Sequence, residues 1–183
     1  LILDNLSGKE IIVSTTGKTS REVFEYRRNN AQGHEKDFLT VGSMGHSSQI
    51  ALGISLNKGD REVFVLDGDG AVIMQMGSLS IIGQKAGKNF RHILLNNGSH
   101  DSVGGQPTAG FNIDFPAIAL ACGYKSAIKA ETKEEILNGL KEIQSCNGPS
   151  FLEIRVNKGA RKDLGRPDTT PAENKINFMK NLI

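Results

Sequence analysis

The sequence predicts a doubly wound α/β domain, with a mostly parallel six-stranded sheet and helices on both faces. Short apolar runs alternate along the chain with segments of helical periodicity. The connections between them are short, which favours right-handed crossovers between parallel strands. Glycine accounts for 21 of 183 residues, against an average usage of about 7%. Much of that glycine directly follows the apolar runs, so we expect the backbone at these positions to lie close to another group.

Six apolar runs predict the strands. Each run is short and rich in Ile, Val, Leu or Phe, the composition of strands buried on both faces. We expect strands at Ile11–Ser14, Phe38–Val41, Val63–Leu66, His92–Leu95, Lys125–Lys129 and Phe151–Val156.

Helical periodicity fills the segments between these strands. Thr132 and Glu135 have the spacing of a capping box, and Thr19 and Glu22 repeat it. A polar, basic stretch without periodicity follows the last strand, and it is either a solvated tail or a lid over a site. We expect helices at Ser20–Asn29, Ser47–Asn57, Val72–Ala86, Phe115–Cys122 and Thr132–Ser145, with a short terminal helix at Asn174–Leu182.

Composition narrows the class of protein. The net charge is +2, from 22 Lys and Arg against 20 Asp and Glu, so nothing indicates a nucleic-acid partner. No apolar run reaches the roughly 18 residues of a membrane span, and charged residues occupy the place of a signal peptide. Cys122 and Cys146 lack metal-ligand spacing and are interpreted as small apolar residues of a cytoplasmic protein. The chain begins with Leu1, so it can be a fragment or a processed product.

Parallel sheets of this kind bind ligands at the carboxyl ends of their strands. The apolar run ending at Leu66 is followed by Asp67-Gly68-Asp69-Gly70. We interpret Asp69 as an oxygen ligand of Mg²⁺, and Gly70 and Ala71 as N–H donors to a phosphate at a helix start. The alternative is a glycine turn with exposed acids. Asn96 and Asn97 follow the next strand, where Asn97 would complete the metal shell.

A second glycine loop, Gly17-Lys18-Thr19, is the tail of a P-loop pattern. The first glycine of that pattern would stand at position 12, which is Ile12, so we reject a Walker A loop. The turn can still hold a phosphate, with help from Lys18. A capped helix start with a surface lysine is an equally good interpretation.

Gly68-Asp69-Gly70 followed by Asn96-Asn97, with residues 71–95 between them, resembles the signature of thiamine-diphosphate-dependent enzymes. The resemblance implies the thiamine-diphosphate-binding fold and a Mg²⁺ held by Asp69, Asn97 and the main-chain carbonyl of Ser99. It also implies that the Gly42 carbonyl accepts a hydrogen bond from the aminopyrimidine, and that Met44 supports the bent cofactor. The cofactor-binding residues are then Gly17, Lys18, Gly42, Met44, Gly68, Asp69, Gly70, Ala71 and Asn97.

Three longer strings, STTGKTSRE at 14–22, NNGSHDSVGGQPT at 96–108 and GARKDLGRP at 159–167, resemble phosphonopyruvate decarboxylases. Sulfopyruvate decarboxylases are similar through Gly104–Thr108. The resemblance implies a carboxy-lyase that converts phosphonopyruvate to phosphonoacetaldehyde and CO₂ in phosphonate (2-aminoethylphosphonate) biosynthesis. A sulfopyruvate decarboxylase beta-type subunit is the alternative. Cationic candidates for the phosphonate are Lys18, Arg161, Lys162 and Arg166.

One part of the family pattern has no match in this chain. These enzymes activate the cofactor with a glutamate on a separate pyrimidine-binding domain, and Glu10, Glu22, Glu25 and Glu35 stand in contexts that do not match that role. We therefore expect a diphosphate- and magnesium-binding domain over 1–157, a tail over 158–183, and an upstream pyrimidine-binding domain that is missing. Alone, the chain would be inactive. Because the family's sites lie between domains of two chains, we expect a homo-oligomer.

His100 lies just after the metal loop and is our candidate to contact the keto acid or relay a proton. A loop histidine bonded to nearby backbone is the alternative. His34 and His92 are expected at the surface or a strand edge. Two other functions are considered: a haloacid-dehalogenase-like phosphotransferase using Asp67 and Asp69, although Ala71 stands where that chemistry requires Thr or Val, and a non-catalytic scaffold subunit.

Overall fold

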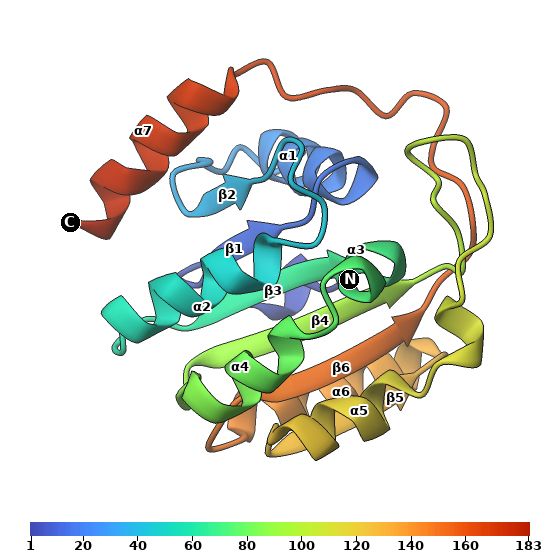
Figure 1. Cartoon of the computed structure of the whole chain (residues 1–183). Helices are drawn as coiled ribbons and strands as arrows, with labels where there is room; N and C mark the ends of the chain where they lie inside the picture. The colour runs from blue at the N-terminus through green and yellow to red at the C-terminus, as the bar shows by residue number, and fades with distance from the viewer.

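The computed structural model describes all 183 residues and contains one six-stranded sheet (Figure 1). All strand pairs are parallel, in the order β2-β1-β3-β4-β6-β5. Every predicted strand is confirmed within two residues at each end. The strands are β1 Ile11–Ser14, β2 Asp37–Leu39, β3 Val63–Gly68, β4 Phe90–Asn96, β5 Ser126–Ala130 and β6 Ser150–Arg155.

Helices cover both faces of this sheet, as the fold class predicts. Helices α2, α4, α5 and α7 pack on one face, and α1 and α6 on the other (Figure 1). Two apolar cores result, one on each side of the strands. The helices are α1 Lys18–Asn29, α2 Ser47–Asn57, α3 Asp69–Met74, α4 Ser78–Lys85, α5 Phe115–Cys122, α6 Lys133–Ser145 and α7 Pro171–Leu182, with 3₁₀ turns η1 Leu3–Asn5 and η2 Gly110–Asn112.

Two local predictions were wrong. The single helix expected over Val72–Ala86 is two helices, α3 and α4, separated by a turn that ends at Gly77. Glycine is a poor helix former, and α3 starts earlier than predicted, directly from the end of β3. The capping box at Thr19 does not form, because α1 begins at Lys18 after Gly17, whose φ is 97°. The box at Thr132 is confirmed.

The terminal helix is longer than predicted and closes the sheet edge. Helix α7 starts at Pro171, and Thr170 and Glu173 form a capping box there. Asn174 Nδ2 donates to the Asp37 carbonyl at 3.0 Å, and Leu39 N donates to Asn174 Oδ1 at 3.2 Å. One side chain thereby continues the hydrogen bonding of edge strand β2, while Phe178 is buried beside it. The edge is covered rather than left open for pairing with another chain.

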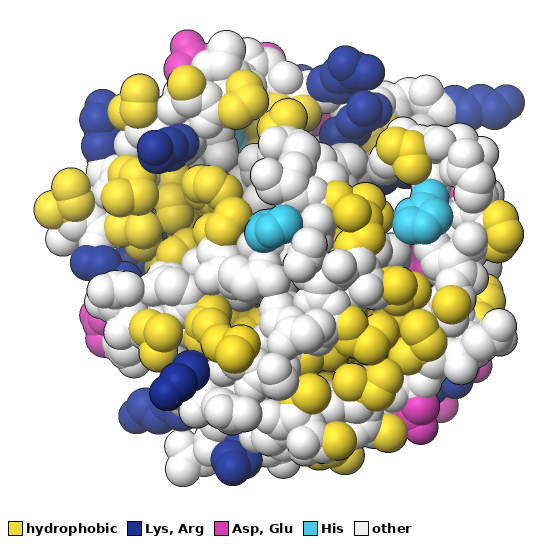
Figure 2. Space-filling view, viewed as in Figure 1, with side chains coloured by type: hydrophobic (Ala, Val, Ile, Leu, Met, Phe, Trp, Pro, Cys, Tyr) yellow, Lys and Arg dark blue, Asp and Glu magenta, His cyan; other side chains and the backbone are white.

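Exposed apolar side chains remain on α4 and α5. Ile81 of α4 is 55% exposed and Leu120 of α5 is 49% exposed, and Figure 2 shows apolar side chains gathered over these two helices. Neither helix, nor any other in the structure, combines the length and apolar character needed to cross a membrane.

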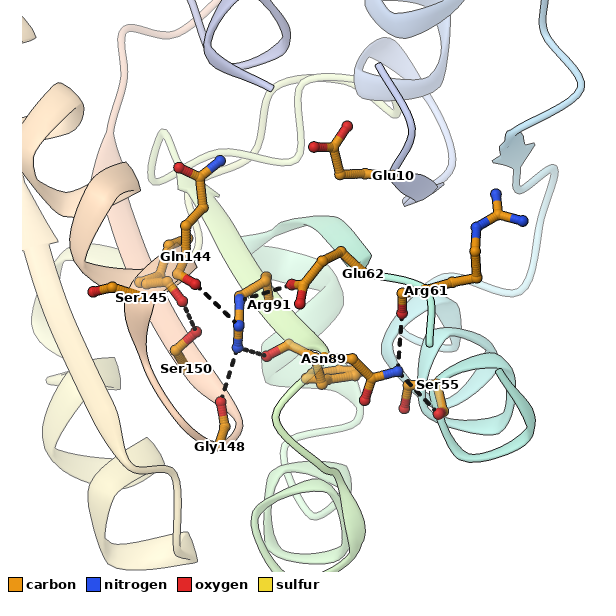
Figure 3. Close-up of polar contacts among 12 residues, drawn as sticks. Glu10, Ser55, Arg61, Glu62, Asn89, Arg91, Gln144, Ser145, Gly148 and Ser150 are labelled. Carbon is orange, nitrogen blue, oxygen red and sulfur yellow. Dashed lines mark hydrogen bonds and ion pairs between the residues drawn. The ribbon is translucent and has the colours of Figure 1, made fainter. Parts of the chain in front are cut away.

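At the amino-terminal edge of the sheet, Arg91 of β4 is the largest buried side chain (Figure 3). Its Nη1 donates to the Gly148 carbonyl at 2.9 Å, and its Nη2 donates to the Gln144 carbonyl at 3.3 Å. The Nε lies 3.1 Å from Oε2 of Glu62. Arg91 therefore joins β4 to the end of α6 and to the segment before β3, on the edge opposite the glycine-rich loops.

We predict that Arg91→Met lowers the free energy of unfolding by about 1–3 kcal/mol, because buried carbonyls lose their donors. Glu62→Gln should cost less than about 1 kcal/mol, since Glu62 is 44% exposed in its side chain and water can replace its partner. Urea unfolding followed by circular dichroism measures both changes. Equal losses in the two variants would show that the ion pair, rather than the carbonyl contacts, determines the stability of this edge.

Candidate functional site

A cavity of about 830 Å³ lies at the carboxyl ends of the central strands. The loops that follow β1, β2, β4 and β6 contribute to its lining, together with the junction of β3 and α3. Every residue predicted to bind cofactor or metal lines it, and so does His100. These lining residues are Gly17, Lys18, Gly42, Met44, Gly68, Asp69, Gly70, Ala71, Asn97, Ser99 and His100. The structure thus brings together loops from different parts of the chain, whereas the role of each residue stays a prediction.

Asp69 enters the cavity at the point where β3 passes directly into α3. Its side chain is buried, and Oδ2 accepts a hydrogen bond from Thr108 Oγ1. Thr108 Oγ1 in turn accepts from Gly110 N at 3.0 Å. No group of the chain donates to Oδ1 of Asp69, so the protein holds one carboxylate oxygen and gives the other no hydrogen-bond partner.

The two asparagines after β4 have different surroundings. Asn96 is fully buried: its Nδ2 donates to the Gly110 carbonyl at 2.8 Å, and its Oδ1 accepts from Gly98 N at 3.2 Å. Asn97 lines the cavity and donates to Asp101 Oδ2 at 2.8 Å. Oδ1 of Asn97 accepts from Ser99 N at 3.0 Å. Asn97 is therefore the member of the pair that can reach a ligand.

Gly70 permits a close contact between two predicted site residues. A Cβ atom at this position would lie 2.6 Å from the His100 ring and 3.0 Å from Met44 Cε. Only a residue without a side chain lets the imidazole and the thioether both reach the start of α3. His100 forms its hydrogen bonds through its main chain, donating to the Gln106 carbonyl at 2.8 Å. Its imidazole makes no hydrogen bond within the chain and lines the cavity.

Asp101 joins three segments at the cavity and is absent from the predicted site residues. It accepts from Gly159 N at 2.7 Å and from Ser99 Oγ at 3.1 Å, and Lys18 Nζ lies 3.8 Å away. Partial burial raises the pKa of Asp101, but these hydrogen bonds and the nearby lysines lower it by more, so the net pKa lies below its ordinary value. The sequence could have indicated Asp101 as a site residue, because it lies inside the family-like string NNGSHDSVGGQPT at 96–108.

The four cationic candidates separate in the structure. Lys18 lines the cavity, whereas Arg161 contacts Glu25 of α1 and lies 3.6 Å from Glu22 and from Asp163. Lys162 and Arg166 do not line the cavity. The chain after β6 passes over α1, and the carboxylates there bind the guanidinium of Arg161.

The basic stretch is anchored at the cavity rim. Gly159 and Ala160 line the cavity, and Gly165 N donates to Glu25 Oε1 at 3.1 Å. The hydrogen bond from Gly165 and the contact with Arg161 lower the pKa of Glu25. Residues 157–163 are exposed to solvent, while the backbone is hydrogen-bonded to Asp101 through Gly159 and to Glu25 of α1 through Gly165, so the stretch is an anchored surface segment. Whether it also acts as a lid stays a prediction.

The prediction for His92 was wrong, since its side chain is fully buried on β4. Its Nδ1 lies 3.1 Å from Tyr124 Oη and its Nε2 lies 3.6 Å from Asp67 Oδ2. Burial raises the pKa of Tyr124 well above its ordinary value, so the phenol stays protonated beside the His92 ring. Asp67 is fully buried as well, which argues against its use as the nucleophile of a phosphotransferase.

Comparison with known proteins gives one family. Residues 15–154 match the C-terminal TPP binding domain of thiamine pyrophosphate enzymes, thiamine pyrophosphate (TPP) being another name of thiamine diphosphate. A phosphonopyruvate decarboxylase of Streptomyces viridochromogenes is 38% identical over 172 residues, which are 94% of this chain and 42% of that protein. The chain therefore spans less than half the length of this relative.

Other relatives are closer in length. A sulfopyruvate decarboxylase subunit beta of Methanocaldococcus jannaschii is 40% identical over 73% of this chain and 68% of the subunit. The subunit beta of Methanococcus maripaludis is 32% identical over 93% of this chain and 88% of the subunit. An X-ray structure described as a thiamin diphosphate-dependent enzyme from Mycobacterium smegmatis superposes with a TM-score of 0.64 at 20% identity, over 86% of this chain and 31% of that one. This last likeness shows the fold.

We predict that Asp101→Ala raises the hydrogen-exchange rate of the Gly159 amide roughly tenfold or more, because a charge-assisted hydrogen bond contributes about 1.5–3 kcal/mol. The Asp101 pKa is lower in the folded chain, so its stabilisation is complete above the ordinary value near ~3.9. It is lost as the pH falls through the lowered value. The Gly159 amide of the wild type should therefore lose protection from exchange in acid. In Asp101→Ala the protection of this amide should not change with pH.

Asp163→Ala is the matched control, since Asp163 is 80% exposed in its side chain and forms an ion pair with Arg161. It should leave exchange at Gly159 unchanged. Equal rates in wild type and Asp101→Ala would show that other contacts hold the segment after β6.

Proposed function

The chain belongs to the thiamine pyrophosphate enzymes, as a C-terminal cofactor-binding domain, and from this premise we propose that its cavity binds thiamine diphosphate together with Mg²⁺. The observation that carries the proposal is the convergence of Asp69, Asn97 and Ser99 on one cavity with the glycines that follow β3. They come from two strands that are neighbours in the sheet.

The donor set suits a magnesium ion. Mg²⁺ prefers oxygen ligands and is usually bound through one or two carboxylates together with phosphate oxygens. Asp69 would supply its free carboxylate oxygen, Asn97 its amide oxygen and Ser99 its main-chain carbonyl. The main-chain N–H groups of Gly70 and Ala71 are positioned to hold the diphosphate at the start of α3.

The remaining predicted residues bind different parts of the cofactor in this proposal. Gly17 and Lys18 contact the diphosphate from the start of α1. The Gly42 carbonyl would accept a hydrogen bond from the aminopyrimidine, and Met44 would support the cofactor from the loop after β2. The contact of Met44 with Gly70 supports this assignment, because it brings the thioether to the start of α3.

We propose that the reaction is the decarboxylation of a 2-keto acid, with phosphonopyruvate as the substrate and phosphonoacetaldehyde and CO₂ as the products. Bound thiamine diphosphate supplies the electron sink that makes loss of the carboxylate feasible. His100 contacts the keto acid or transfers a proton, and its unbonded imidazole in the cavity supports that role. Similarity to phosphonopyruvate decarboxylases over 94% of the chain supports this substrate. We further propose a place in phosphonate biosynthesis and a cytoplasmic location.

A sulfopyruvate decarboxylase subunit beta is the second candidate. The M. maripaludis subunit is 32% identical over 93% of this chain, and this similarity supports it. Under either candidate, a pyrimidine-binding domain supplies the glutamate that activates the cofactor, from the same or another chain. We propose a homo-oligomer that needs this domain for turnover, and the exposed side chains of Ile81 and Leu120 support an interface on α4 and α5.

Asp69→Ala should weaken Mg²⁺-dependent binding of thiamine diphosphate by at least roughly 100-fold, because a direct ligand matters more than the outer-shell partners that cost 10–100-fold. Calorimetric titration measures this, on the chain joined to the domain or subunit that completes the site. Asp60→Ala, at an exposed acid in a turn, is the control and should bind as the wild type does. Wild-type binding without Mg²⁺, or unchanged binding by Asp69→Ala, would contradict the proposal.

Phosphonopyruvate should be decarboxylated with a kcat/KM at least about tenfold above those of sulfopyruvate and pyruvate, because a site that pairs a dianionic group discriminates against analogues that lack it. Product analysis and steady-state kinetics on the completed enzyme measure the ratio. A higher value for sulfopyruvate would move the assignment to the second candidate, and no turnover of any 2-keto acid would support a scaffold role instead.

A further inference from the structure

Glu153 is a buried acid that none of the roles assigned above uses. It lies on β6, and its side chain is 1% exposed. Removing a carboxylate from water is costly unless charge and hydrogen bonds compensate. One oxygen, Oε2, has no hydrogen-bond partner. An acid kept in this position at such a cost requires an explanation from its neighbours.

Two neighbours contact the other oxygen, Oε1. Asn96 Nδ2 donates to it at 2.7 Å, and Arg155 Nε lies 2.8 Å from it. The pairing of β4 with β6 produces this arrangement, because Asn96 stands opposite Arg155 in the register and Glu153 lies two residues earlier on the same strand. Glu153 therefore acts on the first asparagine of the Asn96-Asn97 pair.

The Asn96 amide has only one orientation that satisfies all of its partners. Both acceptors, Glu153 Oε1 and the Gly110 carbonyl, contact Nδ2, so Oδ1 must face the donor Gly98 N. Gly98 stands between Asn97 and Ser99 and has a φ of 64°. The orientation of the Asn96 amide therefore fixes the loop that carries two of the three proposed Mg²⁺ ligands.

Close packing around Asn96 and the loop after β4 restricts their movement. A Cβ on Gly110 would lie 2.5 Å from Asp69 Oδ2 and 2.6 Å from Asn96 Oδ1, so the two side chains converge on this glycine. Arg155 stacks its guanidinium 4.6 Å from the centre of the Phe111 ring. A Cβ on Gly98 would in turn lie 2.8 Å from that ring. Packing and hydrogen bonding thus connect Glu153 and Arg155 to the same loop by two routes.

We propose that Glu153 is a positioning residue for the Mg²⁺ site, which orients Asn96 and through it the ligands Asn97 and Ser99. The inference rests on the proposed function, since it assumes that these residues hold Mg²⁺ with thiamine diphosphate. Glu153→Gln preserves the shape of the side chain but removes its charge and adds a donor toward Asn96. Loss of such an outer-shell partner weakens metal binding roughly 10–100-fold.

The experiment measures thiamine diphosphate binding at graded Mg²⁺ concentrations, by calorimetry, on the chain joined to the domain or subunit that completes the site. Glu153→Gln should raise the Mg²⁺ concentration for half-saturation roughly tenfold or more. The matched control is Asp37→Asn, which makes the same chemical change at another fully buried carboxylate, paired with Arg27 at 3.0 Å on the edge of the sheet. It should lower the thermal unfolding midpoint and leave the Mg²⁺ requirement unchanged.

An unchanged Mg²⁺ requirement in Glu153→Gln, or an equal rise in both variants, would overturn the inference while leaving the proposed function intact. Wild-type protein that binds no thiamine diphosphate with Mg²⁺ would overturn both. Should Glu153→Gln not fold, Arg155→Met provides the test, because Arg155 is partly exposed and Met retains apolar contact with Phe111. We expect it to raise the Mg²⁺ requirement as well, and no rise would overturn the inference.

Discussion

All strands of the sheet run in one direction, so their carboxyl ends meet along one edge and each following loop emerges there. Most features of the molecule depend on this constraint. It places Asp69, the first residue of α3, and Asn97, in the loop after β4, on one cavity. The two ends of the strands also differ in role. Cavity-lining groups lie at the carboxyl ends, while Arg91 and Asn89 donate hydrogen bonds to backbone carbonyls near the amino ends.

Crowding at the carboxyl ends of the strands explains two of the glycines there. Gly70 gives space to His100 and Met44, and Gly110 gives space to Asp69 and Asn96. In each case a methyl group would overlap atoms that the site needs, so glycine serves close approach rather than flexibility. The same crowding lets one carboxylate contact several segments, as Asp101 does with the loop after β4, α1 and the chain after β6.

Buried polar groups beneath the cavity connect its chemistry to the core. Asn96 and Glu153 lie on neighbouring strands and satisfy one another where water is excluded. Such groups strengthen their hydrogen bonds in the low-dielectric interior but tolerate little change. The same holds at the amino ends of the strands, where Arg91 is buried and donates to backbone carbonyls. None of its partners lines the cavity.

The sequence by itself determined the strands, most of the helices and the motif residues of the cavity, but not the division of residues 69–85 into α3 and α4. Strand positions follow from apolar runs, and Asp69, Asn97 and Met44 stand in short motifs whose residue types are readable without a fold. Only the tertiary structure decided which groups are buried and which are paired: His92 lies inside the sheet, Arg161 binds α1 instead of the cavity, and Glu153 contacts Asn96, 57 residues away. The physical reason is that periodicity and propensity act over a few neighbouring residues, whereas burial and hydrogen bonding across strands depend on the pairing order of the sheet.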